Sequence, residues 1–115
     1  DQANAWKEMV RQFLLNGGEL LAQPLSAQDI TGSLRRGIPL VLGIQAGIFW
    51  ALLGTQNMQT RDFRMDHFVV PVCHKNNEIT VNDPFYGIKR CSMSNLLLAC
   101  YRTKEEFGAV FVMPK

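Results

Sequence analysis

The sequence has few cysteines, and they lack the spacing of a metal site or a disulfide framework. The number of cysteines is odd, and no two of them form a C-x-x-C pair: they are Cys73, Cys91 and Cys100. Such a set predicts reduced, buried thiols in a cytoplasmic protein rather than a disulfide-stapled domain. With two histidines in the chain, it also lacks the Cys/His spacing typical of zinc sites. We therefore expect no metal ion and no cofactor.

The chain also lacks an excess of charge, a long apolar run and a glycine-rich phosphate loop. Its net charge of +2 is too small and too scattered to predict binding to nucleic acid. The most apolar run, 38–53, is interrupted by Pro39 and Gln45 and is shorter than the roughly 20 residues of a membrane-spanning helix. The residues given show no basic-then-apolar signal sequence. We expect a cytoplasmic protein without a transmembrane segment.

Residues 1–115 suffice for a single domain with one core. The chain starts at Asp1 without a methionine, and we therefore expect a fragment or a processed chain. Apolar residues at helical spacing predict a helix over 6–14, ended by glycines. Ser26, with Asp29 three residues later, predicts a second, capped helix. Between them, 19–23 is ambiguous, with a short helical turn as one interpretation.

The later segments alternate between strand and helix patterns. The run 38–44 predicts a central strand, and 108–113 predicts a closing strand. A serine-capped helix is expected over 92–101. Residues 46–64 read as a long loop, whose Phe49 and Trp50 either line a substrate groove or cover one end of the core. Together these segments predict an α+β fold, with N-terminal helices packed on a small antiparallel sheet.

A predicted hairpin holds the residues with the clearest chemistry. The strand 67–73 is β-branched or aromatic, 75–77 is a polar turn, and 78–82 alternates polar with apolar residues. On this alternation Cys73 shares the face of His67. Antiparallel pairing then places His67 beside Asp83, where Pro84 ends the second strand.

A histidine next to a carboxylate is the base-and-orienter half of a nucleophilic catalytic site. The structural alternative is a satisfied histidine at a strand end and a plain turn at 82–84, because Asn, Asp and Pro are common turn residues. Taken together with His67, the pattern favours the catalytic interpretation of Asp83.

Three motifs in order carry a resemblance to a known family. They are the helix end and strand entry Arg36-Gly37-Ile38-Pro39-Leu40-Val41, the strand start Asp66-His67-Phe68-Val69-Val70, and the turn Val81-Asn82-Asp83-Pro84. This order resembles the papain-like cysteine peptidases of the bacterial double-glycine leader (bacteriocin-processing) type and their C-thirty-nine-like relatives, over the chain from Ser26 onward. The resemblance implies a papain-like fold, a hydrolase of the thiol protease class and a peptide or protein substrate. It also implies that His67 is the general base and that Asp83 holds its ring in the correct tautomer.

The chain departs from this family at the nucleophile. In such peptidases the nucleophilic cysteine opens a helix in the N-terminal half, after a glutamine of the oxyanion hole, and both precede the segment that matches 6–14. Here the first cysteine is Cys73, which lies six residues along the predicted strand from His67, roughly 20 Å away. Cys91 and Cys100 follow the aspartate, which is the wrong order for the family.

Three hypotheses therefore remain open. The first is the base-bearing part of a cysteine peptidase-like enzyme, acting on amides or thioesters, whose nucleophile lies on a missing N-terminal segment or a partner chain. The second is a degenerate, non-catalytic domain that binds a peptide, for example in secretion. The third is a purely structural role for His67 and Asp83. Under each hypothesis, we expect this chain alone to be inactive.

Overall fold

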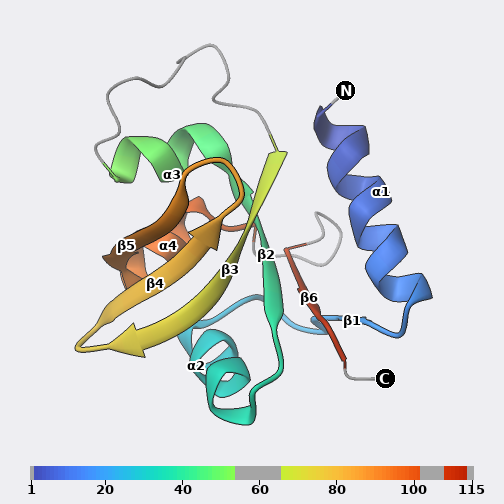
Figure 1. Ribbon diagram of the computed structural model, residues 1–115, viewed down its shortest axis with the longest axis horizontal. Helices are drawn as coiled ribbons and strands as arrows, with labels where there is room; N and C mark the ends of the chain where they lie inside the picture. Colours follow the sequence, from blue (N-terminus) through green and yellow to red (C-terminus); the bar gives the residue numbers. More distant parts are fainter. Residues whose placement is uncertain (1, 54–65, 102–107, 114–115) are drawn as a thin grey trace.

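The computed structural model describes residues 2–53, 66–101 and 108–113. Within these residues the protein is an α+β fold of four helices and a six-stranded antiparallel sheet, with strand order β1-β6-β2-β3-β4-β5 (Figure 1). The elements in chain order are α1 (Gln2–Leu15), β1 (Glu19–Leu20), α2 (Ala27–Arg36), β2 (Leu40–Gln45), α3 (Ala46–Leu52), β3 (Asp66–Lys75), β4 (Glu78–Asp83), β5 (Gly87–Ser92), α4 (Met93–Ala99) and β6 (Ala109–Phe111).

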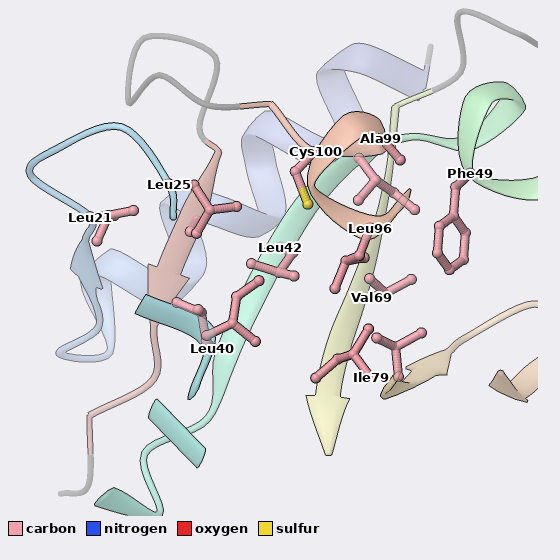
Figure 2. Packing of buried hydrophobic residues seen from close by; sticks show 14 of the residues in the cluster. Leu21, Leu25, Leu40, Leu42, Phe49, Val69, Ile79, Leu96, Ala99 and Cys100 are labelled. Atoms are coloured by element: carbon pink, nitrogen blue, oxygen red, sulfur yellow. The ribbon is translucent and has the colours of Figure 1, made fainter. Parts of the chain in front are cut away.

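Helices cover both faces of the sheet, and β2 lies at its centre. The residues from Leu40 to Ile44 are all buried, as expected for a strand covered on both sides. Val41 points to one face, where it packs with Val10 of α1. Leu42 points to the other face, where the larger cluster includes residues of α2, α3 and α4 (Figure 2).

The second helix begins and ends as its sequence predicts. The Ser26 hydroxyl accepts a hydrogen bond from the Asp29 amide, and the Asp29 carboxylate accepts one from the Ser26 amide at 2.8 Å. This reciprocal pair satisfies two amides that the first helical turn leaves open. Gly37 ends the helix with φ of 68°, a left-handed conformation that glycine adopts without steric cost.

A short edge strand, β1, replaces the helical turn that was one interpretation of 19–23. Gly17 has φ of 93°, which turns the chain away from α1. A side chain at Gly18 would lie 2.8 Å from the Phe13 carbonyl oxygen, so glycine is required where the chain passes this close. Glu19 then pairs with Phe111 of β6.

The predicted loop over 46–64 begins with a helix, α3, so that expectation is wrong for its first residues. Residues 54–64 of the predicted loop lie outside the described residues. Phe49 and Trp50 are both buried, and both pack in the larger core cluster. Packing of this kind stabilises a helix that is too short to form by itself. The position of Phe49 therefore agrees with the interpretation in which these aromatics cover the core.

A fifth strand, β5, was missed by the sequence analysis, which placed a turn and then a helix after Asp83. It pairs with β4 along its whole length, from Asp83↔Gly87 to Glu78↔Ser92. Of the two serines expected to cap the next helix, Ser92 and Ser94, it is Ser92 that caps α4, by accepting a hydrogen bond from the Asn95 amide at 3.1 Å. Among the helices that the structure describes, none is long and apolar enough to span a membrane.

Candidate functional site: a buried histidine–aspartate pair

The hairpin of β3 and β4 turns tightly and then slips by one residue. Asn76 and Asn77 have φ of 53° and 64°, the two left-handed residues of a type I′ turn. Lys75 pairs with Glu78 across this turn. Further along, the register shifts between Pro71 and Cys73, which leaves Val72 as the extra residue of a β-bulge.

The bulge decides which face Asp83 occupies. Without it, the register set by the turn would place Asp83 opposite Val70, whose side chain points away from His67. With it, Val70 pairs with Asn82, and Asp83 therefore lies opposite Val69 on the buried face that His67 shares. His67 and Asp83 are thus diagonal neighbours rather than directly opposed, which corrects the predicted register while keeping the predicted pair.

The same bulge reverses the prediction for Cys73. Cys73 pairs with Thr80, which alternates with the buried residues Ile79 and Val81. Since opposed residues in an antiparallel pair point to the same side, Cys73 lies on the outer face, and it is exposed. The expectation that Cys73 shares the face of His67 is therefore wrong.

The imidazole of His67 contacts the carboxylate of Asp83 inside the protein. His67 Nε2 lies 2.9 Å from Asp83 Oδ1, and the two residues are 4% and 0% exposed. An ionised carboxylate only accepts hydrogen bonds, so Nε2 carries the proton of this bond. In the neutral ring Nδ1 is then the nitrogen with a free electron pair, which makes it the basic atom of the site.

Asp83 is held by further donors at both oxygens. Oδ1 also accepts hydrogen bonds from the backbone amides of Phe85 and Tyr86, at 2.8 and 3.3 Å, as in an Asx turn. Oδ2 accepts one from Trp50 Nε1 at 3.0 Å. Burial by itself raises the pKa of Asp83, but the bonds from His67, Trp50 and the Phe85 amide outweigh it, and the pKa lies below its ordinary value of 3.8. The carboxylate is therefore ionised at neutral pH.

Aromatic rings enclose this pair. The Phe85 ring stacks on the His67 ring at 4.7 Å and 12°, while its outer side is exposed. Trp50 lies 5.5 Å from the His67 ring and meets Tyr86 edge to face at 5.1 Å. The site lies where β3 begins and β4 ends, next to α3 (Figure 1). Such a shell strengthens the bond between His67 and Asp83, because it lowers the local dielectric constant.

The sequence analysis missed the roles of Trp50 and Phe85. Trp50 was one of two bulky residues in a supposed loop, and its partner is 33 positions away in the chain. One signal was available: a buried indole N–H needs an acceptor, and Asp83 was already expected nearby. Phe85 follows the Asp-Pro turn directly, so the turn that presents Asp83 also presents its aromatic cover.

The three thiols lie apart from the basic nitrogen. Cys91 pairs with Ile79, four residues along β5 from Gly87, and burial with the nearby Glu78 charge raises the pKa of its thiol to about 11. Such a thiol is protonated at neutral pH and is a poor nucleophile. Cys100 is buried and bridges to Ile44, which pairs with His67 on its other side. Cys100 and His67 are therefore two strand spacings apart, roughly 10 Å, with Ile44 between them.

The described part of the chain thus brings the His67 imidazole and the Asp83 carboxylate into direct contact. It holds no cluster of three or more His, Cys, Asp or Glu side chains that could bind a metal ion. A scan against models of protein families finds no match to this sequence, and a search of curated proteins finds none either.

Proposed function

We propose that this chain is the base-bearing part of a papain-like cysteine peptidase domain that cleaves an amide or thioester bond in a peptide substrate. The nucleophilic cysteine is supplied by another segment of the protein or by a partner chain. The observation that carries this proposal is the buried, 2.9 Å contact between His67 Nε2 and Asp83 Oδ1. It leaves Nδ1 as the base and provides a fixed negative charge to stabilise the imidazolium.

The proposed reaction follows from this geometry. A cysteine thiol placed against Nδ1 gives its proton to His67, and the thiolate attacks the substrate carbonyl carbon. Asp83 stays ionised and stabilises the imidazolium that results. The imidazolium then protonates the leaving amine or thiolate, which departs as the tetrahedral intermediate collapses to a thioester. A water molecule, deprotonated by Nδ1, hydrolyses this thioester and regenerates the thiol.

The hydrogen bonds and the burial of Asp83 support a catalytic role for the pair over a purely structural one. A strand-end histidine with a structural role needs one hydrogen bond, whereas the carboxylate that bonds His67 has three further donors. A buried charge with this many partners costs desolvation free energy, and sites where several groups converge to keep a carboxylate ionised are typical of functional sites.

The alternative is a non-catalytic domain that binds a peptide. Three large apolar side chains favour it, because they are exposed on the turn after β4 and at the start of β5: Phe85, Tyr86 and Ile88 are 60%, 41% and 62% exposed. Exposed aromatic residues next to one another are typical of interaction surfaces. The same surface also suits substrate binding in the peptidase, so the two functions differ in whether a thiol reaches Nδ1.

A labelling experiment on the protein as it is encoded in its gene distinguishes them. The protein is treated with a slow thiol-directed alkylating reagent, and mass spectrometry gives the rate for each cysteine. We expect one cysteine other than Cys73, Cys91 and Cys100 to react fastest, and His67→Ala to slow it by about 100-fold, the usual effect of losing a general base. The matched control is His74→Ala, which removes the exposed second histidine.

Two results would favour the peptide-binding alternative. One is that the cysteines of the encoded protein all react at the rate of an unactivated thiol. The other is that the fastest cysteine reacts equally fast with His67→Ala and with His74→Ala. In either case no thiol transfers its proton to His67.

A further inference from the structure

We propose that Trp50 is a positioning residue, which fixes the Asp83 carboxylate and thereby holds His67 in the tautomer that a base requires. The catalytic meaning of this inference rests on the proposed function, whereas the effect on the tautomer does not. Trp50 acts through Asp83, whose Oδ2 accepts a hydrogen bond from the indole N–H. Because Trp50 lies in α3, this helix is part of the site, although the segment was expected to be a loop.

The two oxygens of Asp83 differ in their support. Oδ1 has three donors, namely His67 Nε2 and the backbone amides of Phe85 and Tyr86. Among the described residues, Trp50 is the donor to Oδ2, at 3.0 Å. Since Asp83 is fully buried, loss of the indole N–H leaves an anionic oxygen without a partner and away from water.

This difference matters for His67. With Trp50 bonded to Oδ2, the carboxylate cannot rotate about its Cβ–Cγ bond without breaking the bonds at both oxygens. Oδ1 then stays directed at Nε2, and the proton of the neutral imidazole stays on Nε2. Once Oδ2 loses its donor, rotation of the carboxylate away from the ring breaks fewer hydrogen bonds, the bond that Nε2–H donates weakens, and the tautomer with the proton on Nδ1 gains population. In that tautomer Nδ1 cannot accept a proton.

Trp50 also packs against neighbouring aromatic rings. The test must therefore distinguish the loss of this packing from the loss of the hydrogen-bond donor. Its indole contacts the rings of His67, Phe85 and Tyr86, at 5.5, 6.0 and 5.1 Å between centroids. A Trp50→Phe substitution removes both the donor and part of this contact area. Replacement by benzothienylalanine, in which sulfur takes the place of the indole N–H, removes the donor and keeps the shape of the ring.

The test compares these two variants with the unmodified protein and with Phe49→Leu. Phe49 is the neighbouring buried aromatic of α3 and packs in the core cluster, so Phe49→Leu controls for a loosened helix. The first readout is the nitrogen-15 spectrum of the His67 ring at neutral pH, which distinguishes a protonated from an unprotonated ring nitrogen. The second is the His67-dependent thiol labelling rate in the encoded protein.

In the unmodified protein and in Phe49→Leu, we expect Nε2 to be protonated and Nδ1 to be unprotonated. With benzothienylalanine and with Trp50→Phe, we expect the two nitrogens to share the proton and the labelling rate to fall about tenfold. Mutation of a group that orients an active-site histidine typically has an effect of this order. The assignment of Trp50 is overturned if the sulfur analogue leaves Nε2 fully protonated, or if Phe49→Leu changes the tautomer as much as Trp50→Phe does.

The failure of the proposed function gives a separate result. If the sulfur analogue changes the tautomer but no cysteine of the encoded protein is labelled in a His67-dependent way, Trp50 does position the histidine. The peptidase activity is then contradicted, and the Trp50–Asp83–His67 chain serves a binding site instead.

Discussion

Asp83 carries a negative charge in a position without exposed surface, and its stability there depends on its hydrogen bonds. The bonds from His67, Trp50 and the Phe85 amide outweigh the cost of burial, so its pKa lies below 3.8 in the folded protein. A carboxyl group with a lowered folded-state pKa binds a proton more weakly when folded than when unfolded. It therefore stabilises the fold above the unfolded pKa, and this contribution is lost as the pH falls through the folded pKa.

The pH dependence of unfolding tests this account of Asp83. At pH 6 we expect Asp83→Asn to lower the free energy of unfolding by about 2 kcal/mol, because Trp50 Nε1 or His67 Nε2 loses its charged acceptor. The difference between the two proteins should shrink as the pH is lowered from 5 to 3, since the unfolded wild type then takes up a proton at Asp83 more readily than the folded protein does. Urea unfolding across this range measures it. The control is Glu8→Gln at an exposed site.

A difference between wild type and Asp83→Asn that stays constant from pH 6 to pH 3 would contradict this account. It would mean that folding leaves the pKa of Asp83 unchanged, so that the hydrogen bonds from His67 and Trp50 do not favour its charged form. Glu8→Gln removes a carboxylate whose ion pair with Arg11 lies at the surface, and it should change the free energy of unfolding by less than about 1 kcal/mol.

At the scale of elements, the bulge in β3 is the feature on which the site depends most. One extra residue, Val72, moves Asp83 from the face of Val70 to that of His67. The residue sequence does not reveal such a slip, because every residue from 67 to 73 apart from Cys73 is β-branched, aromatic or proline and fits either face. The predicted pair was therefore correct in its members but wrong in its register, and the face assigned to Cys73 was wrong for the same reason.

Deletion of Val72 tests the role of the bulge. In the deletion variant Cys73 follows Pro71 directly, so the pairs Pro71↔Val81 and Cys73↔Thr80 become consecutive in a regular ladder. Asp83 then stays opposite Val69, and we expect the contact with His67 to be kept and the free energy of unfolding to change by about 1 kcal/mol. Val72→Ala, which shortens a half-exposed side chain, should change it by less than about 1 kcal/mol.

Thermal unfolding followed by circular dichroism gives both values. A deletion variant less stable than wild type by more than about 3 kcal/mol, the usual result when a buried charge loses its partner, would contradict the assignment of Val72 as the extra residue of β3. Because Val72→Ala keeps the residue count of the strand, it separates the effect of register from the effect of the side chain.

Other elements were predictable to different degrees for identifiable reasons. The second helix and the hairpin turn carry local signals, a capping box and two asparagines, and both were found. The strand β1 has two residues and β5 is largely exposed, so neither shows the apolar alternation that β4 shows. The helix α3 is apolar along almost its whole length, so no stripe stands out in it. Their structure depends on partners elsewhere: β6 for β1, β4 for β5, and α4 with the core for α3.

At the scale of the molecule, the sheet gathers the site from three separate segments. His67 comes from the start of β3, Asp83 from the end of β4, and Trp50 from α3 (Figure 1). The predicted α+β class is confirmed. It was predictable because the longer helices and strands carry clear apolar periodicity in the sequence. The contact between Trp50 and Asp83 was not predictable in this way, since nothing local in either segment refers to the other. A papain-like arrangement stays a proposal that rests on His67 and Asp83.

Cross-linking with dibromoacetone tests the central claim most directly. This reagent alkylates a thiol and an imidazole nitrogen that lie about 5 Å apart, with loss of two bromides, and so reports which cysteine lies beside Nδ1 of His67. In the encoded protein we predict one cross-linked peptide pair, joining His67 to a cysteine other than Cys73, Cys91 and Cys100. A protein that forms no cross-link to His67, while its thiols are alkylated singly, would contradict the account.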